Sequence, residues 1–392
     1  MSQPIRVAIL GLGQRGLQHL KALWKLQGEG LIKIAALMDA FEDNLAEAKI
    51  QRYVDGFQID GIHTSTDFAK TLAELSLDAI YFALPPGVHN GEISQAANAG
   101  VHIFAEKPMS LHLNEAIDME RAIAENGVIS TAGFQQRYDA RYEAVHDFLA
   151  DKQPVMTTMI VNGALEGHSI KHTKTETLGG PANRVWTANY EWSGATVVEG
   201  GIHQTDLMRY WFGDISWVEA NYIHRDASDI VDGGNNPYAY SVRYGFECGC
   251  IANLILSRLR QTYYSEGYES ILWTHGHLKF EGNDVVAYYY DGPYPPVQTP
   301  STEVVRHLLP LPHSTDPTEQ ISRAFLGAIG AGNSDQLRST FASSMNSLAA
   351  VLGANVSDQL DGERVYLKDL LRDAKYENFR QKPTNRTEEF IP

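Results

Sequence analysis

The sequence predicts an α/β domain built on a doubly wound parallel sheet, followed by an α+β domain with a large, mainly antiparallel mixed sheet. Three observations lead to this prediction. Near the start of the chain, a glycine-rich turn joins a short apolar run to a helical pattern, over residues 7–24. Apolar runs and helical patterns then alternate up to Ala132, as in parallel sheets with crossover helices. Beyond about Asp151, alternating polar and apolar runs follow one another with few helices between them, which is typical of antiparallel strands.

The first apolar run, Val7–Leu10, leads into three glycines spaced as Gly-x-Gly-x-x-Gly. Gly11 permits a tight turn, Gly13 lets the backbone approach a pyrophosphate, and Gly16 lets the following helix pack close to the strand. The start of that helix offers free N–H groups and the positive end of its dipole to phosphates. We therefore expect a Rossmann dinucleotide-binding domain. The other cofactor contacts expected in this turn are Leu12, Gln14 and Arg15.

The second strand, Ile32–Met38, ends at Asp39, about twenty residues beyond the last glycine. An acidic side chain at this place accepts hydrogen bonds from ribose hydroxyls and repels a 2′-phosphate. The sequence therefore predicts NAD rather than NADP as the cofactor.

The remaining elements follow from the same patterns. Asp67 can cap a helix over residues 68–75, and Gly100 ends another over residues 90–99. Further helices are expected over residues 41–52, 113–126, 320–329 and 339–356. Strands over residues 78–84, 101–105 and 128–132 complete the first sheet. The second sheet is expected to contain residues 155–161, 218–224, 238–246, 250–256, 270–274 and 278–281. The expected domain boundaries are 1–132 for the first domain, 133–370 for the second and 371–392 for a C-terminal tail.

Two strand ends bring further polar residues to one edge of the first sheet, where ligands of such sheets bind. The strand over residues 78–84 leads into the turn Pro85–His89, and the strand over residues 101–105 leads into Glu106 and Lys107. The proline that follows restricts the lysine backbone, so its side chain is expected to project beside the nicotinamide. The cofactor contacts expected here and in the next segment are Leu84, Pro85, His89, Glu106, Lys107 and Gln135.

Composition excludes several classes of partner. The 392 residues carry a net charge of −16, which argues against DNA, RNA or an anionic membrane as a partner. No apolar run approaches the roughly twenty residues that span a bilayer. The chain enters a strand almost at once, so we expect no signal peptide and a cytoplasmic location. His168, His172, His275 and His277 lack a third ligand at a suitable spacing, so no metal site is expected.

Residues 178–194 are rich in Gly, Asn, Trp and Tyr and are expected to form a long functional loop. Aromatic faces with a few charged groups suit a carbohydrate. The substrate contacts expected from this loop and from nearby segments are Arg137, His168, Arg184, Trp186 and Tyr190.

Over nearly its whole length, the chain resembles the Gfo/Idh/MocA family of glucose–fructose oxidoreductase and inositol dehydrogenase. The motifs that carry the resemblance are Gly11-Leu-Gly-Gln-Arg-Gly, Asp39, Pro85–His89, Ala105-Glu-Lys-Pro, Gly133-Phe-Gln-Gln-Arg, Glu199-Gly-Gly-Ile-His-Gln-Thr-Asp, Thr274-His-Gly-His-Leu-Lys-Phe-Glu-Gly and Gly362-Glu-Arg-Val. The resemblance implies a Rossmann domain followed by a mixed-sheet domain whose face commonly forms dimers or tetramers.

The resemblance also implies roles for individual residues. Lys107 matches the family's catalytic lysine, which hydrogen-bonds the reacting oxygen, and His203 matches its acid–base histidine. Glu199 stands where many sugar dehydrogenases of the family carry aspartate, and a spacing of four places it on one face with His203 if the segment is helical. Asp206, also an expected substrate contact, could hold the imidazole in one tautomer. Two positions depart from the family pattern: Glu199 is longer than aspartate, and Pro86 replaces the usual asparagine.

The implied reaction transfers a hydride between NAD and a secondary hydroxyl or keto carbon of a sugar, sugar derivative or cyclic polyol. Either the histidine or a lysine with a lowered pKa could take the hydroxyl proton, and the lysine could instead stabilise alkoxide charge. The runner-up is an NAD-dependent glycosidase that works by transient C3 oxidation, elimination and re-reduction. A third alternative, a non-catalytic NAD sensor, would leave Lys107 and His203 without a role.

Overall fold

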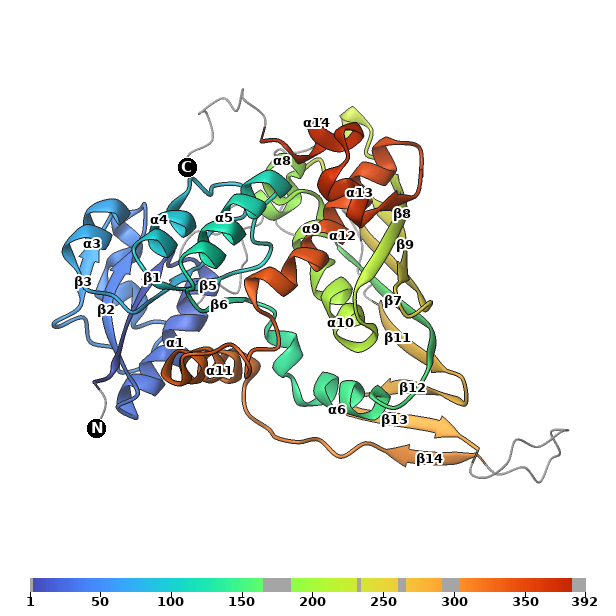
Figure 1. Ribbon diagram of the computed structural model, residues 1–392, viewed down its shortest axis with the longest axis horizontal. Coiled ribbons are helices and arrows are strands. Elements are labelled where there is room, and N and C mark those ends of the chain that lie inside the picture. Colours follow the sequence, from blue (N-terminus) through green and yellow to red (C-terminus); the bar gives the residue numbers. More distant parts are fainter. Residues whose placement is uncertain (1–2, 165–184, 231–233, 260–265, 291–303, 383–392) are drawn as a thin grey trace, which may run out of the picture.

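The computed structural model describes residues 3–164, 185–230, 234–259, 266–290 and 304–382. Two sheets lie on either side of a central group of helices that includes α9, α10 and α12 (Figure 1). The predicted division into a parallel first sheet and a mixed second sheet is confirmed.

All strands of the first sheet are parallel, in the order β3-β2-β1-β4-β5-β6. These strands are β1 Ile5–Leu10, β2 Ile32–Met38, β3 His63–Ser65, β4 Ala79–Phe82, β5 His102–Ala105 and β6 Ser130–Ala132. Val7, Ala8 and Ile9 are completely buried because helices cover both faces of the sheet. The helices between these strands are α1 Gln14–Gly28, α2 Glu47–Ile50, α3 Phe68–Glu74, α4 Glu92–Asn98 and α5 Leu113–Glu125.

The structure differs from the prediction after the second strand. The helix expected over residues 41–52 is wrong as a continuous element, because it divides into a 3₁₀ turn, η1 Glu42–Leu45, and the short α2. Ala46 between them has an extended backbone, with ψ 122°. Edge strand β3 was not predicted, since its three polar residues are not buried and carry no apolar pattern.

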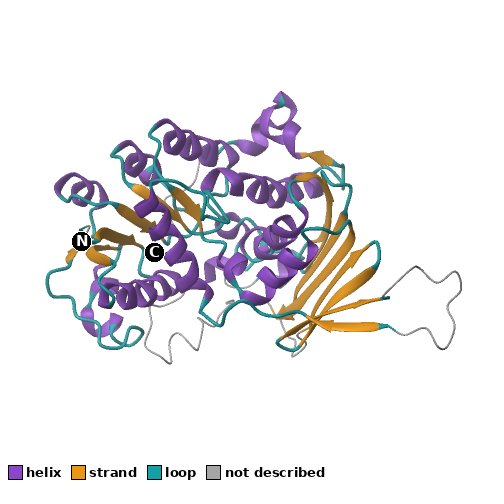
Figure 2. Ribbon diagram, turned by 60° about the horizontal axis from the view of Figure 1, so that its bottom comes forward, coloured by secondary structure: helices purple, strands orange, loops and turns teal. Residues whose placement is uncertain are grey.

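The second sheet has nine strands in the order β14-β13-β12-β11-β7-β10-β9-β8-β15. Among the described strands of this sheet, only β7 and β10 pair in parallel, and the other neighbours are antiparallel. On β9, Tyr240, Val242 and Tyr244 are buried, whereas Ser241 and Arg243 on the opposite face are exposed. The sheet therefore has one face against helices and one open face (Figure 2). Its strands are β7 Pro154–Ala164, β8 Ile215–Ile223, β9 Ala239–Phe246, β10 Ile251–Leu259, β11 Glu266–Trp273, β12 Gly276–Glu281, β13 Asp284–Tyr289, β14 Val305–Leu308 and β15 Val365–Tyr366.

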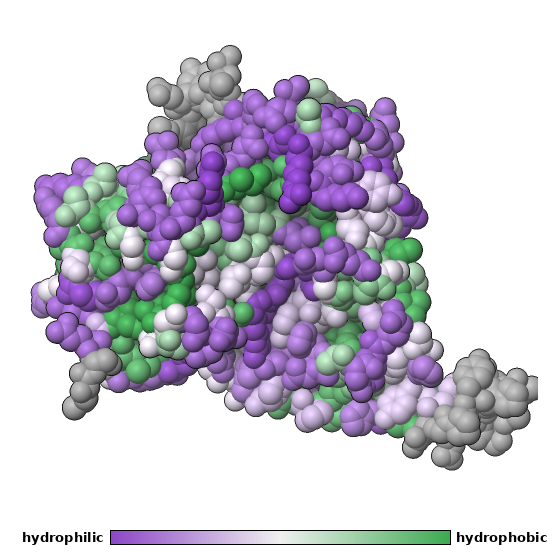
Figure 3. All heavy atoms as spheres, in the orientation of Figure 1, coloured by the Kyte–Doolittle hydropathy of each residue, from purple (hydrophilic) through white to green (hydrophobic). Residues whose placement is uncertain are grey.

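The helices that follow the first sheet are α6 Ala140–Leu149, α8 Tyr190–Ser193, α9 Thr196–Glu199, α10 Ile202–Phe212, α11 Pro317–Ala331, α12 Phe341–Gln359, α13 Leu367–Arg372 and α14 Glu377–Arg380. Short 3₁₀ turns occur at η2 Gln135–Tyr138, η3 Val185–Ala188, η4 Ala227–Asp229 and η5 Ala374–Tyr376. None of the helices in the described ranges is long and apolar enough to cross a membrane. Hydrophilic side chains cover most of the face seen in Figure 3.

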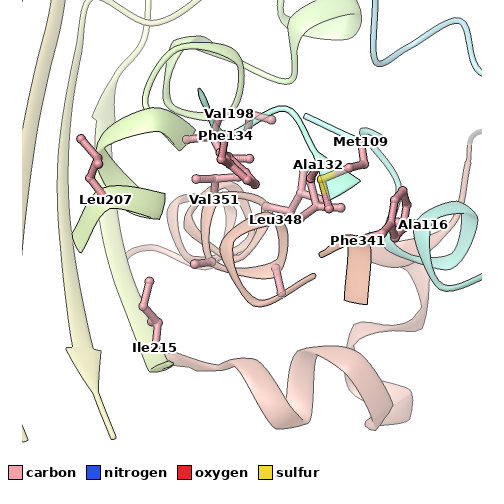
Figure 4. Packing of buried hydrophobic residues seen from close by; sticks show 14 of the residues in the cluster. Met109, Ala116, Ala132, Phe134, Val198, Leu207, Ile215, Phe341, Leu348 and Val351 are labelled. Atoms are coloured by element: carbon pink, nitrogen blue, oxygen red, sulfur yellow. The ribbon is translucent and has the colours of Figure 1, made fainter. Parts of the chain in front are cut away.

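The two sheets share a continuous apolar core around α12. Met109 after β5 and Phe134 after β6 meet Val198 of α9 beside Leu348 and Val351 of α12 (Figure 4). The domains are therefore packed together through a helix from near the C-terminus.

Helix α11 also returns to the first domain, where it packs beside α1 (Figure 1). Phe325 of α11 makes edge-on contacts with the rings of Tyr81 and Phe104, 5.7 Å away in each case. Helices from later in the chain pack against both sheets. The domain boundary expected between residues 132 and 133 therefore stays a prediction.

Candidate active site

The glycine turn lies between β1 and α1 and has the backbone that a phosphate site needs. Gly11 has a φ of +94°, and a Cβ there would lie 2.5 Å from the carbonyl oxygen of Ala83. A Cβ at Gly16 would lie 1.8 Å from the carbonyl oxygen of Gly11, so α1 can pack here only without a side chain. By contrast, a Cβ at Gly13 would meet nothing within 4 Å. The turn is thus closed toward the protein and open beside the N-terminus of α1.

Asp39 lies at the end of β2 and is hydrogen-bonded to the same turn. Its Oδ2 accepts from the backbone N–H of Leu12 at 2.6 Å, and its Oδ1 accepts from Phe41 N at 2.9 Å and Asn44 Nδ2 at 3.0 Å. The sequence predicted a ribose contact at this position. The structure adds a second task, because the carboxylate also holds the glycine turn in place.

Behind the turn, the partly buried Arg15 and the buried His19 both contact the buried carboxylate of Glu106. Glu106 Oε1 accepts from Arg15 Nε at 2.7 Å and from His19 Nε2 at 2.6 Å, and its Oε2 accepts from the backbone N–H of Lys107 at 3.2 Å. Burial alone would raise the pKa of Glu106, but Arg15 and His19 hold it far below its usual 4.5. A Cβ at Gly133 would lie 2.7 Å from this carboxylate, which explains the glycine there.

His19 was not among the predicted site residues. It is completely buried, and burial followed by the charge of Arg15 lowers its pKa below 6.5, so the neutral ring donates from Nε2 to Glu106. The only sequence signal was a polar residue on the inward face of α1, between Leu17 and Leu20.

Lys107 and Glu199, predicted as catalytic residues from different domains, are in direct contact. Lys107 follows β5, and its Nζ donates to the backbone oxygen of Glu199 at 2.9 Å and to Glu199 Oε1 at 3.1 Å. Glu199 ends α9 and His203 lies in the first turn of α10, so the two residues are on separate helices rather than on one continuous helix. A Cβ at Gly201 would lie 2.6 Å from Val197 O and 2.9 Å from Leu256 Cδ1, so the position between α9 and α10 has no room for a side chain.

His203 keeps unused hydrogen-bonding capacity. Its Nδ1 is buried, and no described residue hydrogen-bonds to it. Burial, and then the positive charge of Lys107, lowers the pKa of His203 well below 6.5, with Arg15 acting in the same direction and Glu106 opposing it. The ring is therefore neutral near pH 7. The expected contact with Asp206 does not form.

Arg137 and Asp206 bind each other instead of pointing freely into the site. Arg137 Nε and Nη2 each donate to a carboxylate oxygen of Asp206 at 2.7 Å, and Ser347 Oγ donates to Asp206 Oδ1 at 2.7 Å. Both members of the pair are buried. Within the described residues, neither charged group is hydrogen-bonded to the cluster of Lys107, Glu199 and His203.

The structure disperses the remaining predicted residues. His89 is buried and paired with Glu92, so its ring is committed to that carboxylate. Tyr190 on α8 is partly buried, and its hydroxyl accepts from Gln359 Nε2 at 3.4 Å. Leu84, Pro85 and Trp186 are also partly exposed. His168 and Arg184 lie outside the described residues, and among the described ones no three His, Cys, Asp or Glu side chains are grouped as a metal site requires.

The residues present fit a dinucleotide. The open position at Gly13 leaves room for phosphate oxygens beside the first turn of α1. Arg15 Nη2 and Gln135 Oε1 are buried, and no described residue hydrogen-bonds to either atom, which leaves a donor and an acceptor available. Asp39 lies at the adjacent strand end, where such folds bind ribose.

Comparison with known proteins identifies the family of the chain. The model of an oxidoreductase family with an NAD-binding Rossmann fold matches residues 5–134, and that of the family's C-terminal alpha/beta domain matches residues 159–276. The scyllo-inositol 2-dehydrogenase (NAD(+)) of Bacillus subtilis (strain 168) is 27% identical over 220 residues, which cover 54% of this chain and 55% of that protein. Myo-inositol 2-dehydrogenase of Thermotoga maritima is 24% identical over 229 residues, covering 58% and 60%. The chain thus spans little more than half the length of these curated relatives.

Solved structures share the fold across both domains. An oxidoreductase from Agrobacterium radiobacter in complex with NAD+, L-tartaric acid and magnesium has a TM-score of 0.72 at 15% identity, covering 94% of this chain and 99% of that one. Levoglucosan dehydrogenase in complex with NADH and L-sorbose has a TM-score of 0.73 at 16% identity, covering 93% and 99%. With both family models matched in order, the chain belongs to the Gfo/Idh/MocA oxidoreductase family, which has an NAD-binding Rossmann fold.

Proposed function

We propose that the protein is an NAD-dependent oxidoreductase that transfers a hydride to or from a secondary carbon of a sugar, sugar derivative or cyclic polyol. The observation that carries the proposal is the contact between Lys107 of the first domain and Glu199 of the second, beside a neutral His203. Lys107 lies just after β5, at the sheet edge where the glycine turn and Asp39 also lie. A dinucleotide and a hydroxyl group would therefore meet at this edge.

The cofactor would be held by the residues that leave donors and acceptors open. The Gly11–Gly16 turn and the first turn of α1 would bind the pyrophosphate, and Asp39 would bind the adenosine ribose. Gln135 lies in the turn after β6, where its unpaired oxygen could accept a hydrogen bond from the cofactor. When bound, the nicotinamide supplies the hydride acceptor for oxidation and the hydride donor for reduction.

The protein side chains would handle the proton. Lys107 is held by the Glu199 carbonyl and carboxylate, so one of its hydrogens remains for the oxygen of the substrate. This donor would stabilise the negative charge that develops on that oxygen. The neutral imidazole of His203 would accept the hydroxyl proton during oxidation and return it during reduction.

The substrate class is supported by the named relatives and by two aromatic residues on the segment that leads to Glu199. Two relatives are inositol dehydrogenases, and one structural neighbour is a levoglucosan dehydrogenase. Trp186 and Tyr190 are partly exposed on the segment that leads to Glu199, where they could contact the apolar face of a sugar ring. No observation on this chain favours the glycosidase alternative.

A panel assay tests this proposal. Purified protein is incubated with NAD and a set of polyols, sugars and glycosides while reduced cofactor and released aglycone are followed together. We expect stoichiometric NADH with at least one polyol or sugar. Aglycone release without NADH would instead support the glycosidase, and bound NAD with neither product would support a sensor.

The open face of the second sheet supports assembly into a homodimer or homotetramer, and the cytoplasmic location stays a prediction from the sequence. Met156, Ile223, Ile251 and Tyr268 are exposed apolar residues on strands of that sheet. Exposed apolar patches on a monomer commonly mark a protein–protein interface. Light scattering should give a mass of two or four chains, and Ile251→Glu should lower it.

A further inference from the structure

The buried pair of Arg137 and Asp206 joins the segment that follows the first sheet to helix α10. Arg137 lies on η2, five residues after the end of β6, the last strand of the first sheet. Asp206 lies on α10 in the second domain, and Ser347 of α12 hydrogen-bonds to its carboxylate. The pair therefore connects three elements that surround the shared core of Figure 4.

The geometry of this pair leaves little freedom. The guanidinium and the carboxylate make two parallel hydrogen bonds of 2.7 Å, with only 7% and 2% of the two side chains exposed. Arg137 Nη1 donates to the backbone oxygen of Arg338, and the guanidinium lies over the ring of Tyr210, 5.1 Å from its centre. Asp206 and Tyr210 are one turn apart, so Arg137 contacts α10 at two successive levels.

The same helix carries His203, and the same sheet edge carries Lys107. His203 precedes Asp206 by three residues, or about 4.5 Å along a helix. On the other side, β5 and β6 are paired through Ala105 and Ala132, and Gly133 N donates to Ala105 O at 2.8 Å. Lys107 and Arg137 therefore lie in the segments that follow two paired strands of one sheet.

We propose that Arg137 and Asp206 are positioning residues, which set the distance between Lys107 and His203 by fixing α10 to the end of the first sheet. This inference rests on the proposed oxidoreductase function, and it replaces the substrate contacts that the sequence predicted for both residues. Misplacing a reacting group by 1 Å can cost about 10²-fold in rate. The pair would thus act on turnover without touching the substrate.

The test uses Arg137→Gln, Asp206→Asn and the double variant in the full-length protein with NAD and the substrate from the panel. Each single variant should lower kcat about 10²-fold, whereas KM and the Kd for NAD stay within about threefold. The double variant should be no slower than the slower single variant, because both changes break the same ion pair between Arg137 and Asp206. A loss confined to KM would return the pair to substrate binding and overturn the proposal.

A matched control exists on the same helix. Arg209 of α10 and Asp214, two residues beyond the end of that helix, form a more exposed ion pair, with Arg209 Nε and Nη2 at 2.8 and 2.7 Å from Asp214 Oδ1. Asp214→Asn removes this pair without affecting η2, so its kcat should equal that of the wild type. Arg137→Lys keeps the charge but not the two-pronged geometry, so it should fold and still lose kcat. If Arg137→Gln fails to fold, this variant decides the question.

A second readout does not require turnover. Histidine NMR with selective labelling follows the titration of His203, assigned by its loss in His203→Asn. Lys107, Arg15 and Glu106 are the charges that face this ring. If α10 moves away from Lys107, the pKa of His203 should rise toward 6.5 in Arg137→Gln or Arg137→Lys. Wild-type protein that turns over nothing would contradict the proposed function alone, whereas folded variants with an unchanged His203 titration would contradict the positioning role.

Discussion

Two polar clusters near the join of the domains contrast in how their hydrogen bonds are used. In the first cluster, the ion pair of Arg137 and Asp206 (called the joint below), both carboxylate oxygens and three guanidinium nitrogens form hydrogen bonds to protein groups. In the cluster of Lys107, Glu199 and His203, one imidazole nitrogen has no partner among the described residues. The Lys107 and Glu199 side chains are 11% and 22% exposed, against 7% and 2% in the joint.

This difference separates a cluster that holds geometry from a cluster that can react. A substrate hydroxyl could bind at the joint only by breaking hydrogen bonds between buried charges, which is costly. At Lys107 and His203 it would instead complete hydrogen bonds that the protein leaves unmade. Variants in the two clusters should therefore affect different steps.

The largest effect is expected for Lys107→Met. Loss of the hydrogen-bond donor at the reacting oxygen should lower kcat about 10³-fold. The Kd for NAD, measured by fluorescence titration, should stay nearly unchanged because the glycine turn and Asp39 are intact. Undiminished turnover would show that the open cluster does not carry the reaction.

His203 should control the acid side of the pH profile. Because its pKa is well below 6.5, the ring is already neutral at pH 6.5, and the rate of oxidation should fall only as the pH drops through the lowered value. His203→Asn should lower kcat about 10²-fold and abolish this acid limb. An acid limb centred near 6.5 in the wild type would mean that the ring is not desolvated.

The parts of this site that the sequence predicted are local in the chain. The glycine turn, Asp39 and Lys107 each lie within two residues of a strand end, so their places on the sheet edge follow from the order of the elements. Arg137 and Asp206 are 69 residues apart, and nothing in the local pattern of either one predicts a partner. Because the sequence shows no partner for either charged side chain, both were predicted to contact the substrate.

The fold shows the same difference between elements that local sequence predicts and elements that depend on distant partners. Buried apolar runs predicted five strands of the first sheet, but β3, with only His63, Thr64 and Ser65, has no such run. Helix α6 was missed because its sequence mixes charged and apolar residues with little one-sided pattern. The parallel pairing of β7 with β10 joins distant segments, so it could not be predicted from alternation within either strand.

Glu106→Gln should act on stability. Removing the charge leaves Arg15 and His19 without their ionised partner and should lower the free energy of unfolding by about 3 kcal/mol. Since the pKa of Glu106 is depressed in the folded protein, its contribution is present above pH 4.5 and is lost as the pH falls toward the lowered value. Urea unfolding at neutral pH measures the loss, and an unchanged midpoint would contradict it.

Asp39→Ala should have a smaller effect, on cofactor binding. It removes hydrogen bonds to Leu12 and to the ribose, and should raise the Kd for NAD about tenfold. It should also reduce the preference for NAD over NADP. Isothermal titration with both cofactors checks this. A wild type that binds NADP more tightly than NAD would mean that the role of Asp39 is misassigned.

The smallest effect is expected for Glu281→Gln. Its carboxylate pairs with Arg306 in an exposed part of the second sheet, where solvent screens the interaction. Neither thermal stability nor kcat should change measurably. A clear loss of activity would show that charges remote from the two clusters also set the geometry of the site.

A crystal structure of the wild-type protein with NADH and a polyol from the panel tests the central claim most directly. The account predicts that a substrate oxygen lies about 3 Å from both Lys107 Nζ and a ring nitrogen of His203. The pair of Arg137 and Asp206 should remain closed. A substrate that binds Arg137 or Asp206 and leaves Lys107 paired only with Glu199 would contradict the account.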